Sequence, residues 1–209
     1  MLGPLKTLLG TRPVVLASAS PRRRQILQDV NFPVEIIPSH FEETLDKAAF
    51  PQPWRYVEET ALGKAKEVAG RLGDRQDWAV VIGADTVVVL DNKILEKPGS
   101  DARAREMLTS LSGRQHTVFT GLALVWKGGE RVSHEATLVS FAPLTPQVID
   151  SYLSSGEPLD KAGAYGIQGE GGTLVARIEG DYFNVVGLPL HRLCCELSAV
   201  LPTILNSSS

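Results

Sequence analysis

The sequence predicts an α/β protein with a mixed sheet and flanking helices. Short apolar runs of strand length alternate with segments of helical periodicity. Two pairs of strand-like runs are joined by tight turns, Asp91-Asn92 and Lys127-Gly128-Gly129-Glu130, which is typical of antiparallel hairpins. Because hairpins accompany strand–helix–strand segments, a mixed sheet is favoured over a purely parallel, doubly wound one.

The first elements follow from local signals. Pro13–Ala17 is a short apolar run and predicts a buried strand. Ser20 suits an N-cap and is followed by proline, so a helix is expected over Pro21–Val30. Phe32–Pro38 reads as a second strand. The acidic, proline-broken stretch 39–53 predicts a loop.

The middle of the chain carries the clearest periodicity. Apolar residues recur at helical spacing over 54–72, and Gly73 is expected to end that helix. Its apolar stripe consists of Val57, Ala61, Ala65, Val68 and Leu72. Trp78–Leu90 predicts a long strand that turns back into a short one at 93–95.

The remaining elements complete the sheet. Ser100 suits the cap of a helix that runs to about Leu111, and 116–126 and 131–141 predict alternating strands. A helix is expected between Thr145-Pro146 and Gly156, and a glycine-rich stretch follows over 163–172. The last strand and helix are expected at 173–178 and 189–201.

Composition bounds the class of protein. The 209 residues, 43% of them hydrophobic and 22% charged, suit one large globular domain or two small lobes that share a sheet. A net charge of −3 argues against a broad nucleic-acid surface. The longest apolar runs are far too short to cross a bilayer. We therefore expect a domain over 12–202, with terminal extensions 1–11 and 203–209, and neither a membrane nor a nucleic acid as partner.

The cysteines and the first residues predict the compartment. Cys194 and Cys195 are adjacent in an apolar helical stretch, where a bridge between them would be strained. We expect two buried thiols in a reducing compartment. Residues 1–11 lack the apolar core and cleavage site of a secretory signal. Together these features predict a cytoplasmic protein.

The loop Ser18–Arg24 is the first candidate site. A strand ends, a serine turn follows, and a helix begins with Arg22, Arg23 and Arg24. The helix dipole disfavours cations at a helix start, so three arginines there indicate a negative partner. Phosphate suits it, because guanidinium binds phosphate as a fork. The alternative is a solvated basic turn, and the Walker pattern is absent.

Asp85 is the second candidate, in Gly83-Ala84-Asp85-Thr86 within the apolar run 79–90. A lone carboxylate is costly to bury, so Asp85 must meet a metal, a cation or solvent. The alternative is a strand-edge bulge, in which Gly83 marks a kink and Asp85 faces water.

Lys64 and the pair Glu42-Glu43 are ambiguous. Lys64 lies on the apolar stripe of its helix, so it either reaches outward to solvent or pairs with a buried anion. The two glutamates are either solvated or, together with Asp85, form an oxygen-ligand site for Mg²⁺ or Mn²⁺.

The stretch Glu157–Gly169 is the last candidate. Its glycines permit tight turns and a close approach to a ligand. Gln168 offers both a donor and an acceptor, which suits reading the edge of a base. The alternative is a surface loop. His116 and His191 are expected to pack or to cap.

Taken together, these segments resemble the Maf family of nucleotide pyrophosphatases. Seven matching segments occur in the family's order and cover about residues 13–200. They are Ser18–Arg24, Glu59-Thr60-Ala61 with Lys64-Ala65, Gly83–Val87, Lys97-Pro98, His116–Gly121, Glu157–Gly169, and Gly180-Asp181-Tyr182 with Asn184–Pro189. The chain also resembles the amino-terminal part of animal proteins that carry a Maf domain ahead of a methyltransferase-like domain. It shows no methyl-donor motif.

The resemblance implies an elongated mixed sheet with two lobes around a cleft, like that of the inosine triphosphate pyrophosphatases (the Maf/Ham1 fold). It implies hydrolysis of a nucleoside triphosphate to the monophosphate and pyrophosphate by a homodimer, in the dTTP/UTP branch rather than the branch acting on 7-methyl-GTP. Modified pyrimidine nucleotides are further possible substrates.

The resemblance also assigns roles. Asp85 matches the general base, and Glu43 with Asp85 matches the metal ligands. The phosphate-contacting positions are Ser18, Arg23, Lys64 and Lys97. The positions that sort substrates are Arg22, Thr86 and Gln168. The alternative function is a non-catalytic nucleotide-binding or scaffolding module of a larger fusion protein.

Overall fold

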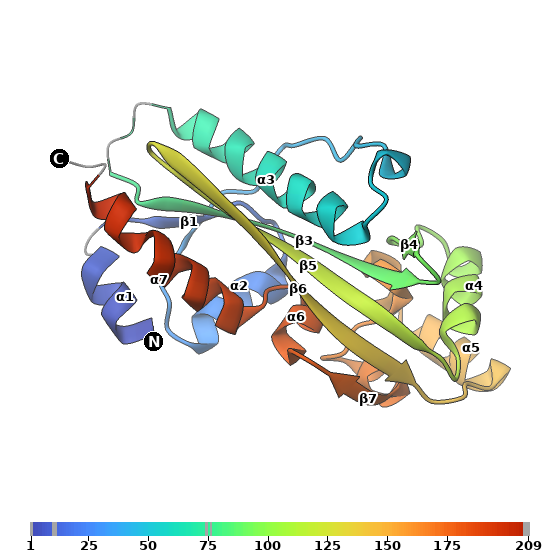
Figure 1. The fold of residues 1–209 in the computed structure, drawn as a ribbon. Helices are drawn as coiled ribbons and strands as arrows, with labels where there is room; N and C mark the ends of the chain where they lie inside the picture. The colour runs from blue at the N-terminus through green and yellow to red at the C-terminus, as the bar shows by residue number, and fades with distance from the viewer. Residues whose placement is uncertain (1, 10–11, 74, 76, 207–209) are drawn as a thin grey trace. The chain divides into compact units, whose positions relative to one another are not determined.

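The computed structural model describes residues 2–9, 12–73, 75 and 77–206, and these form a mixed sheet with flanking helices, as predicted (Figure 1). The strand order is β2-β1-β3-β5-β6-β7, and β4 pairs with β3. β1 is parallel to β2 and β3, whereas β3 and β4, and β6 and β7, are antiparallel. The strands are β1 (Val14–Leu16), β2 (Glu35–Ile36), β3 (Val80–Leu90), β4 (Lys93–Leu95), β5 (Gln115–Trp126), β6 (Gly129–Phe141) and β7 (Val175–Glu179).

The helices follow the predicted order, with two further helices, α1 and α6, and a longer α7. Their bounds are α1 (Leu2–Leu9), α2 (Pro21–Asp29), α3 (Pro53–Leu72), α4 (Asp101–Leu111), α5 (Pro146–Ser154), α6 (Tyr182–Val186) and α7 (Leu190–Asn206). Short 3₁₀ turns are η1 (Lys47–Ala49), η2 (Glu157–Asp160), η3 (Ala162–Ala164) and η4 (Glu170–Leu174). The sequence predicted neither α1 nor α6, and α7 continues through Pro202 beyond the expected end at 201.

The predicted terminal extensions are partly structured. Leu5 and Leu9 of α1 are buried, and α1 contacts α7. Residues 1, 10, 11 and 207–209 of these extensions lie outside the described residues. Across the described part of the chain, the helices are all too short or too polar to cross a bilayer. Cys194 is buried as expected, but Cys195 is exposed, because α7 turns the second thiol away from its apolar face.

The chain divides into two compact units. The first comprises residues up to 85 together with 120–135 and 187 onward, and the second comprises 86–119 and 136–186. In the first unit, apolar residues of α3 pack against β1, β3 and β5. This cluster contains Val15, Ala17, Ala61, Ala65, Val68, Leu72, Trp78, Val81, Ala123 and Val125. The α3 stripe predicted from periodicity is therefore the inner face of the helix.

Two strand glycines let α3 approach the sheet closely. A Cβ atom added at Gly83 of β3 would lie 2.1 Å from the carbonyl oxygen of Ala61. One added at Gly121 of β5 would lie 2.1 Å from the carbonyl oxygen of Val57. Gly83 therefore marks backbone contact with a helix inside a continuous strand, and not the kink of an edge bulge.

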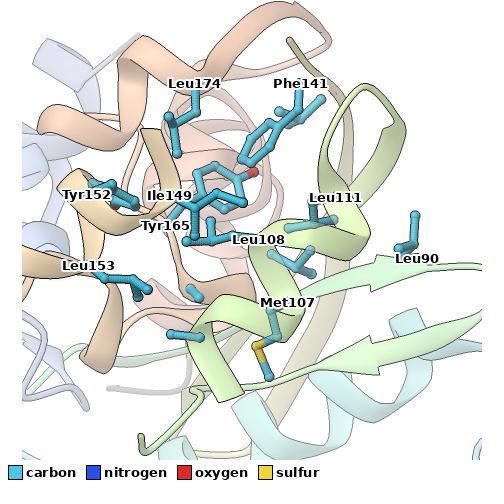
Figure 2. Packing of buried hydrophobic residues seen from close by; sticks show 14 of the residues in the cluster. Leu90, Met107, Leu108, Leu111, Phe141, Ile149, Tyr152, Leu153, Tyr165 and Leu174 are labelled. Carbon is cyan, nitrogen blue, oxygen red and sulfur yellow. The ribbon is translucent and has the colours of Figure 1, made fainter. Parts of the chain in front are cut away.

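The second unit has its own core, drawn in Figure 2. Leu108 and Leu111 of α4 face Ile149 and Tyr152 of α5, and Tyr165 lies among them (Figure 2). His116 is buried beside this core, where its Nε2 lies 2.8 Å from the hydroxyl oxygen of Tyr165. Because burial disfavours the charged ring, it lowers the pKa of His116 to about 4. The prediction that His116 packs is confirmed.

We predict that Gly83→Ala lowers the free energy of unfolding by about 1–3 kcal/mol, because the added methyl group would force α3 away from β3. Urea unfolding measures this change. Gly70→Ala is the matched control, since Gly70 lies on the exposed side of α3 with no atom within 4 Å of an added Cβ. The control is expected to gain about 0.5–1 kcal/mol. Equal unfolding midpoints for Gly83→Ala and the wild type would contradict the close-approach argument.

Candidate active site

The serine turn between β1 and α2 holds one arginine in place. The Ser18 hydroxyl oxygen is buried and accepts hydrogen bonds from the Ser20 N–H and from Arg23 Nη1, both at 3.2 Å. Arg23 Nε donates to the Gly187 carbonyl oxygen at 2.8 Å. Ser20 occupies the predicted N-cap position, but its side chain makes no capping hydrogen bond. Ser18, rather than Ser20, organises the turn.

The three arginines of this loop have different surroundings. Arg24 is exposed, whereas Arg22 and Arg23 are partly buried. Desolvation lowers the pKa of Arg23 and neighbouring Arg22 lowers it further, while the charges of Asp85 and Glu43 oppose the shift. A desolvated, positioned guanidinium beside two carboxylates is not the solvated basic turn of the alternative interpretation.

Lys64 joins two of the predicted carboxylates. Its ammonium lies 2.7 Å from Glu43 Oε1 and 2.8 Å from Asp85 Oδ1. The side chains of Lys64 and Asp85 are 12% and 11% exposed, whereas that of Glu43 is 50% exposed. We call these three residues the ion-pair centre. Lys64 therefore pairs with a buried anion and does not reach outward to solvent, and Asp85 does not face water.

Local structure explains how Lys64 and Asp85 meet. Gly83 and Asp85 are two residues apart in β3, so their side-chain directions share one face of the strand. That face receives α3, whose backbone at Ala61 touches Gly83. Lys64 is three residues further along α3, on the same side of the helix as Ala61. The close approach of helix and strand thereby brings the ammonium to the carboxylate.

Burial makes Asp85 a better proton acceptor than an ordinary aspartate, despite its pairing with Lys64. Burial raises the pKa of Asp85, and the charge of Glu43 adds to the rise. The ammonium of Lys64 and the guanidinium of Arg23 act in the opposite direction. A carboxylate with a raised pKa, close to two cations that attract phosphate, suits general-base chemistry.

The same carboxylates offer the donors that a hard cation prefers. The oxygens of Glu43 and Asp85 converge on one ammonium, so a divalent ion would compete with Lys64 for them. Among the described residues, no group of three or more His, Cys, Asp or Glu side chains could hold a metal. The two carboxylates fit Mg²⁺ or Mn²⁺ when water and substrate phosphates supply the remaining ligands, as is usual for Mg²⁺.

The other predicted residues belong to the second unit. Thr86 follows Asp85 in β3 and is partly buried. Lys97 is exposed between β4 and α4, and Gln168 is exposed between η3 and η4. The structure therefore brings together, within the first unit, Ser18, Arg23, Glu43, Lys64 and Asp85.

Sequence reasoning gave Gly187 no role, although it named the segment that contains this residue. Its carbonyl oxygen fixes Arg23, and its φ of 124° lies in the region that favours glycine. The contact spans 164 residues of sequence, so local signals could not reveal it.

Asp85→Asn is expected to become more stable relative to the wild type as pH rises. The folded pKa of Asp85 lies above its ordinary value of 3.8, so in the pH window above 3.8 the native state binds more protons than the unfolded state. Wild-type stability therefore falls as pH rises through the folded pKa, and asparagine removes this loss. Urea unfolding at several pH values from about 4 to 8 measures the difference.

Asp150→Asn, at an exposed carboxylate of α5, is the matched control for loss of a charge. If the stability of Asp85→Asn relative to wild type stays flat or falls as pH rises, folding does not raise the pKa of Asp85.

Comparisons with known proteins agree on one family. The family model described as Maf-like protein matches residues 13–200. The chain is 54% identical over 179 residues to a dTTP/UTP pyrophosphatase of Moorella thermoacetica, covering 85% of this chain and 89% of the relative. It is 47% identical over 186 residues to a dTTP/UTP pyrophosphatase of Bacillus cereus, covering 89% and 94%.

Two further similarities are partial. A human probable bifunctional dTTP/UTP pyrophosphatase/methyltransferase protein is 48% identical over 207 residues, which cover 94% of this chain but 33% of the human protein. Among solved structures, the Staphylococcus aureus Ham1 protein matches with a TM-score of 0.45 and 17% identity, covering 63% of this chain and 72% of that one. The Ham1-like arrangement, with two lobes around a cleft, stays a prediction. The family model and the curated relatives show that the chain belongs to the Maf family.

Proposed function

We propose that this chain hydrolyses dTTP and UTP to the monophosphate and pyrophosphate, with Asp85 as the general base. The prediction of a nucleotide diphosphatase is confirmed by relatives at 47% and 54% identity that are named dTTP/UTP pyrophosphatases. The observation that supports the mechanism is the ion-pair centre, in which a buried carboxylate of raised pKa meets an ammonium. An intact centre also argues against a non-catalytic scaffold.

The chemistry follows from charge and position. Phosphoryl transfer depends mainly on placing the reactants and neutralising charge. Arg23 and Lys64 offset the charge of the triphosphate. A phosphate oxygen that pairs with the Lys64 ammonium would replace Asp85 in that contact and leave the carboxylate able to accept a proton. Asp85 then accepts a proton from water, whose oxygen forms a new bond to phosphorus. The bond between the α-phosphate and the departing pyrophosphate breaks, and pyrophosphate carries away its electron pair.

We also propose a divalent cation, Mg²⁺ or Mn²⁺, held by Glu43 and Asp85. When bound, such an ion neutralises phosphate charge and lowers the pKa of its water ligand. The support is the converging pair of carboxylate oxygens on Lys64.

The remaining roles rest on the family resemblance. We propose that Ser18 and Lys97 contact phosphate, and that Arg22, Thr86 and Gln168 select the nucleotide. The exposed amide of Gln168 is free to meet the edge of a base. Action on modified pyrimidine nucleotides, a homodimer, a cytoplasmic location and the absence of nucleic-acid partners stay predictions.

Asp85→Asn is expected to lower the rate of pyrophosphate release by about 10²–10⁴-fold while leaving the protein folded, because the amide cannot accept the proton. The assay is pyrophosphate release from dTTP with Mg²⁺ or Mn²⁺, with a chelator as the metal-free arm. Asp150→Asn controls for the loss of a carboxylate elsewhere. Near-normal turnover by folded Asp85→Asn would overturn the assignment of the base.

Gln168→Glu is expected to change the choice of substrate more than the affinity for metal, because it replaces an amide donor by an acceptor. The measurement is kcat/KM for dTTP, UTP and 7-methyl-GTP, with metal titration alongside. Unchanged relative values across the three nucleotides would count against a role for Gln168 in selection.

A further inference from the structure

The loop that carries Gln168 is built around a single carboxylate. We define the Gln168 loop as residues 166–171, which follow η3 and include the first two residues of η4. Glu157 belongs to η2 and is only partly exposed. Its Oε2 accepts the Glu170 N–H at 3.0 Å, and its Oε1 accepts the Gly171 N–H at 3.4 Å. The carboxylate therefore binds the backbone on the far side of Gln168.

Tyr152 holds the near side of the same loop. Its buried hydroxyl oxygen accepts the Gly166 N–H at 3.1 Å, and its hydroxyl donates to Glu157 Oε1 at 3.0 Å. The Tyr152 ring is fixed by the core of the second unit (Figure 2). One hydroxyl and one carboxylate thus bind the loop both before and after Gln168. We call Tyr152 and Glu157 the loop clamp.

The glycines of this loop are explained by the loop clamp. A Cβ atom at Gly166 would lie 2.7 Å from Glu157 Oε1, and one at Gly169 would lie 2.2 Å from Glu157 Oε2. One at Gly171 would lie 2.4 Å from the Tyr152 hydroxyl oxygen. The backbone wraps so tightly around the clamp that side chains at these three positions would displace it.

Gln168 is exposed at the middle of the clamped turn, where its amide can reach a ligand. An amide on a flexible loop could not discriminate between bases, because its donor and its acceptor could turn to suit any of them. A fixed backbone restricts the positions that the amide can reach. Discrimination between substrates needs polar groups held in place, so that the wrong base leaves them unpaired.

We propose that Tyr152 and Glu157 are positioning residues for substrate selection, acting through Gln168. They hold the Gln168 loop in the conformation that reads the base, and they do not take part in the attack on phosphorus. This inference rests on the proposed role of Gln168 as a selecting residue.

The sharpest variant is Glu157→Gln. The carboxylate accepts from three donors through two oxygens, whereas an amide has one oxygen and would turn an N–H donor toward another donor. We expect kcat/KM for dTTP relative to 7-methyl-GTP to fall on the order of tenfold, mainly through the KM for dTTP. Backbone amide exchange at Gly166, Glu170 and Gly171 is expected to quicken.

Two variants test the same clamp by other routes. Tyr152→Phe keeps the buried ring but removes the hydroxyl, and it is expected to shift selection in the same direction. Glu157→Asp retains a carboxylate and is expected to recover part of the lost preference. The matched control is Glu170→Gln in the same loop, where the exposed side chain changes but the backbone N–H that binds Glu157 stays. Its substrate preference is expected to match the wild type.

A Gln168→Ala variant distinguishes failure of the positioning role from failure of the proposed function. Gln168→Ala is measured in parallel, and an unchanged substrate preference in that variant would reject Gln168 as a selecting residue. If Gln168→Ala shifts the preference but folded Glu157→Gln and Tyr152→Phe do not, the positioning role is wrong while the proposed function stands. Equal loss on all nucleotides, in proportion to lost stability, would show a purely structural clamp and would also overturn the inference.

Discussion

The ammonium of Lys64 lies between a buried carboxylate and an exposed one, and the proposed chemistry depends on that contact. The contact exists because α3 lies directly on β3 and β5, with Gly83 and Gly121 making room for the helix backbone. Moving the helix outward by the width of a methyl group would separate Lys64 from Asp85. The buried aspartate would then lack its main compensating charge, which is costly. The packing of α3 on the sheet therefore sets the electrostatics of Asp85.

Much of the fold could be predicted from the sequence, because its signals are local. The caps at Ser100 and Thr145 accept the N–H groups of Arg103 and Val148, as capping residues should. The hairpin turn at Asp91-Asn92 joins β3 to β4, and both turn residues have positive φ. Periodicity alone identified the inner face of α3. Each of these features depends on residues within a few positions of one another.

The rest required contacts between distant residues. The five residues of α6 are too few to show a helical period, and α7 runs past the expected end at 201 through Pro202, with Ile204 buried. In the site, local reasoning left Lys64 free to point either way, since the answer depends on the distance between α3 and β3. Glu157 belonged to a predicted candidate segment, yet only the folded backbone shows which amides it binds.

The loop clamp constrains how this enzyme could be redesigned. A library that randomises the whole segment 157–171 would mostly sample clashes, because Gly166 and Gly169 touch one carboxylate and Gly171 touches the hydroxyl. A productive library would vary Gln168 alone and keep its scaffold fixed. Among the loop positions, Gln168 can then be varied without a side chain meeting the clamp.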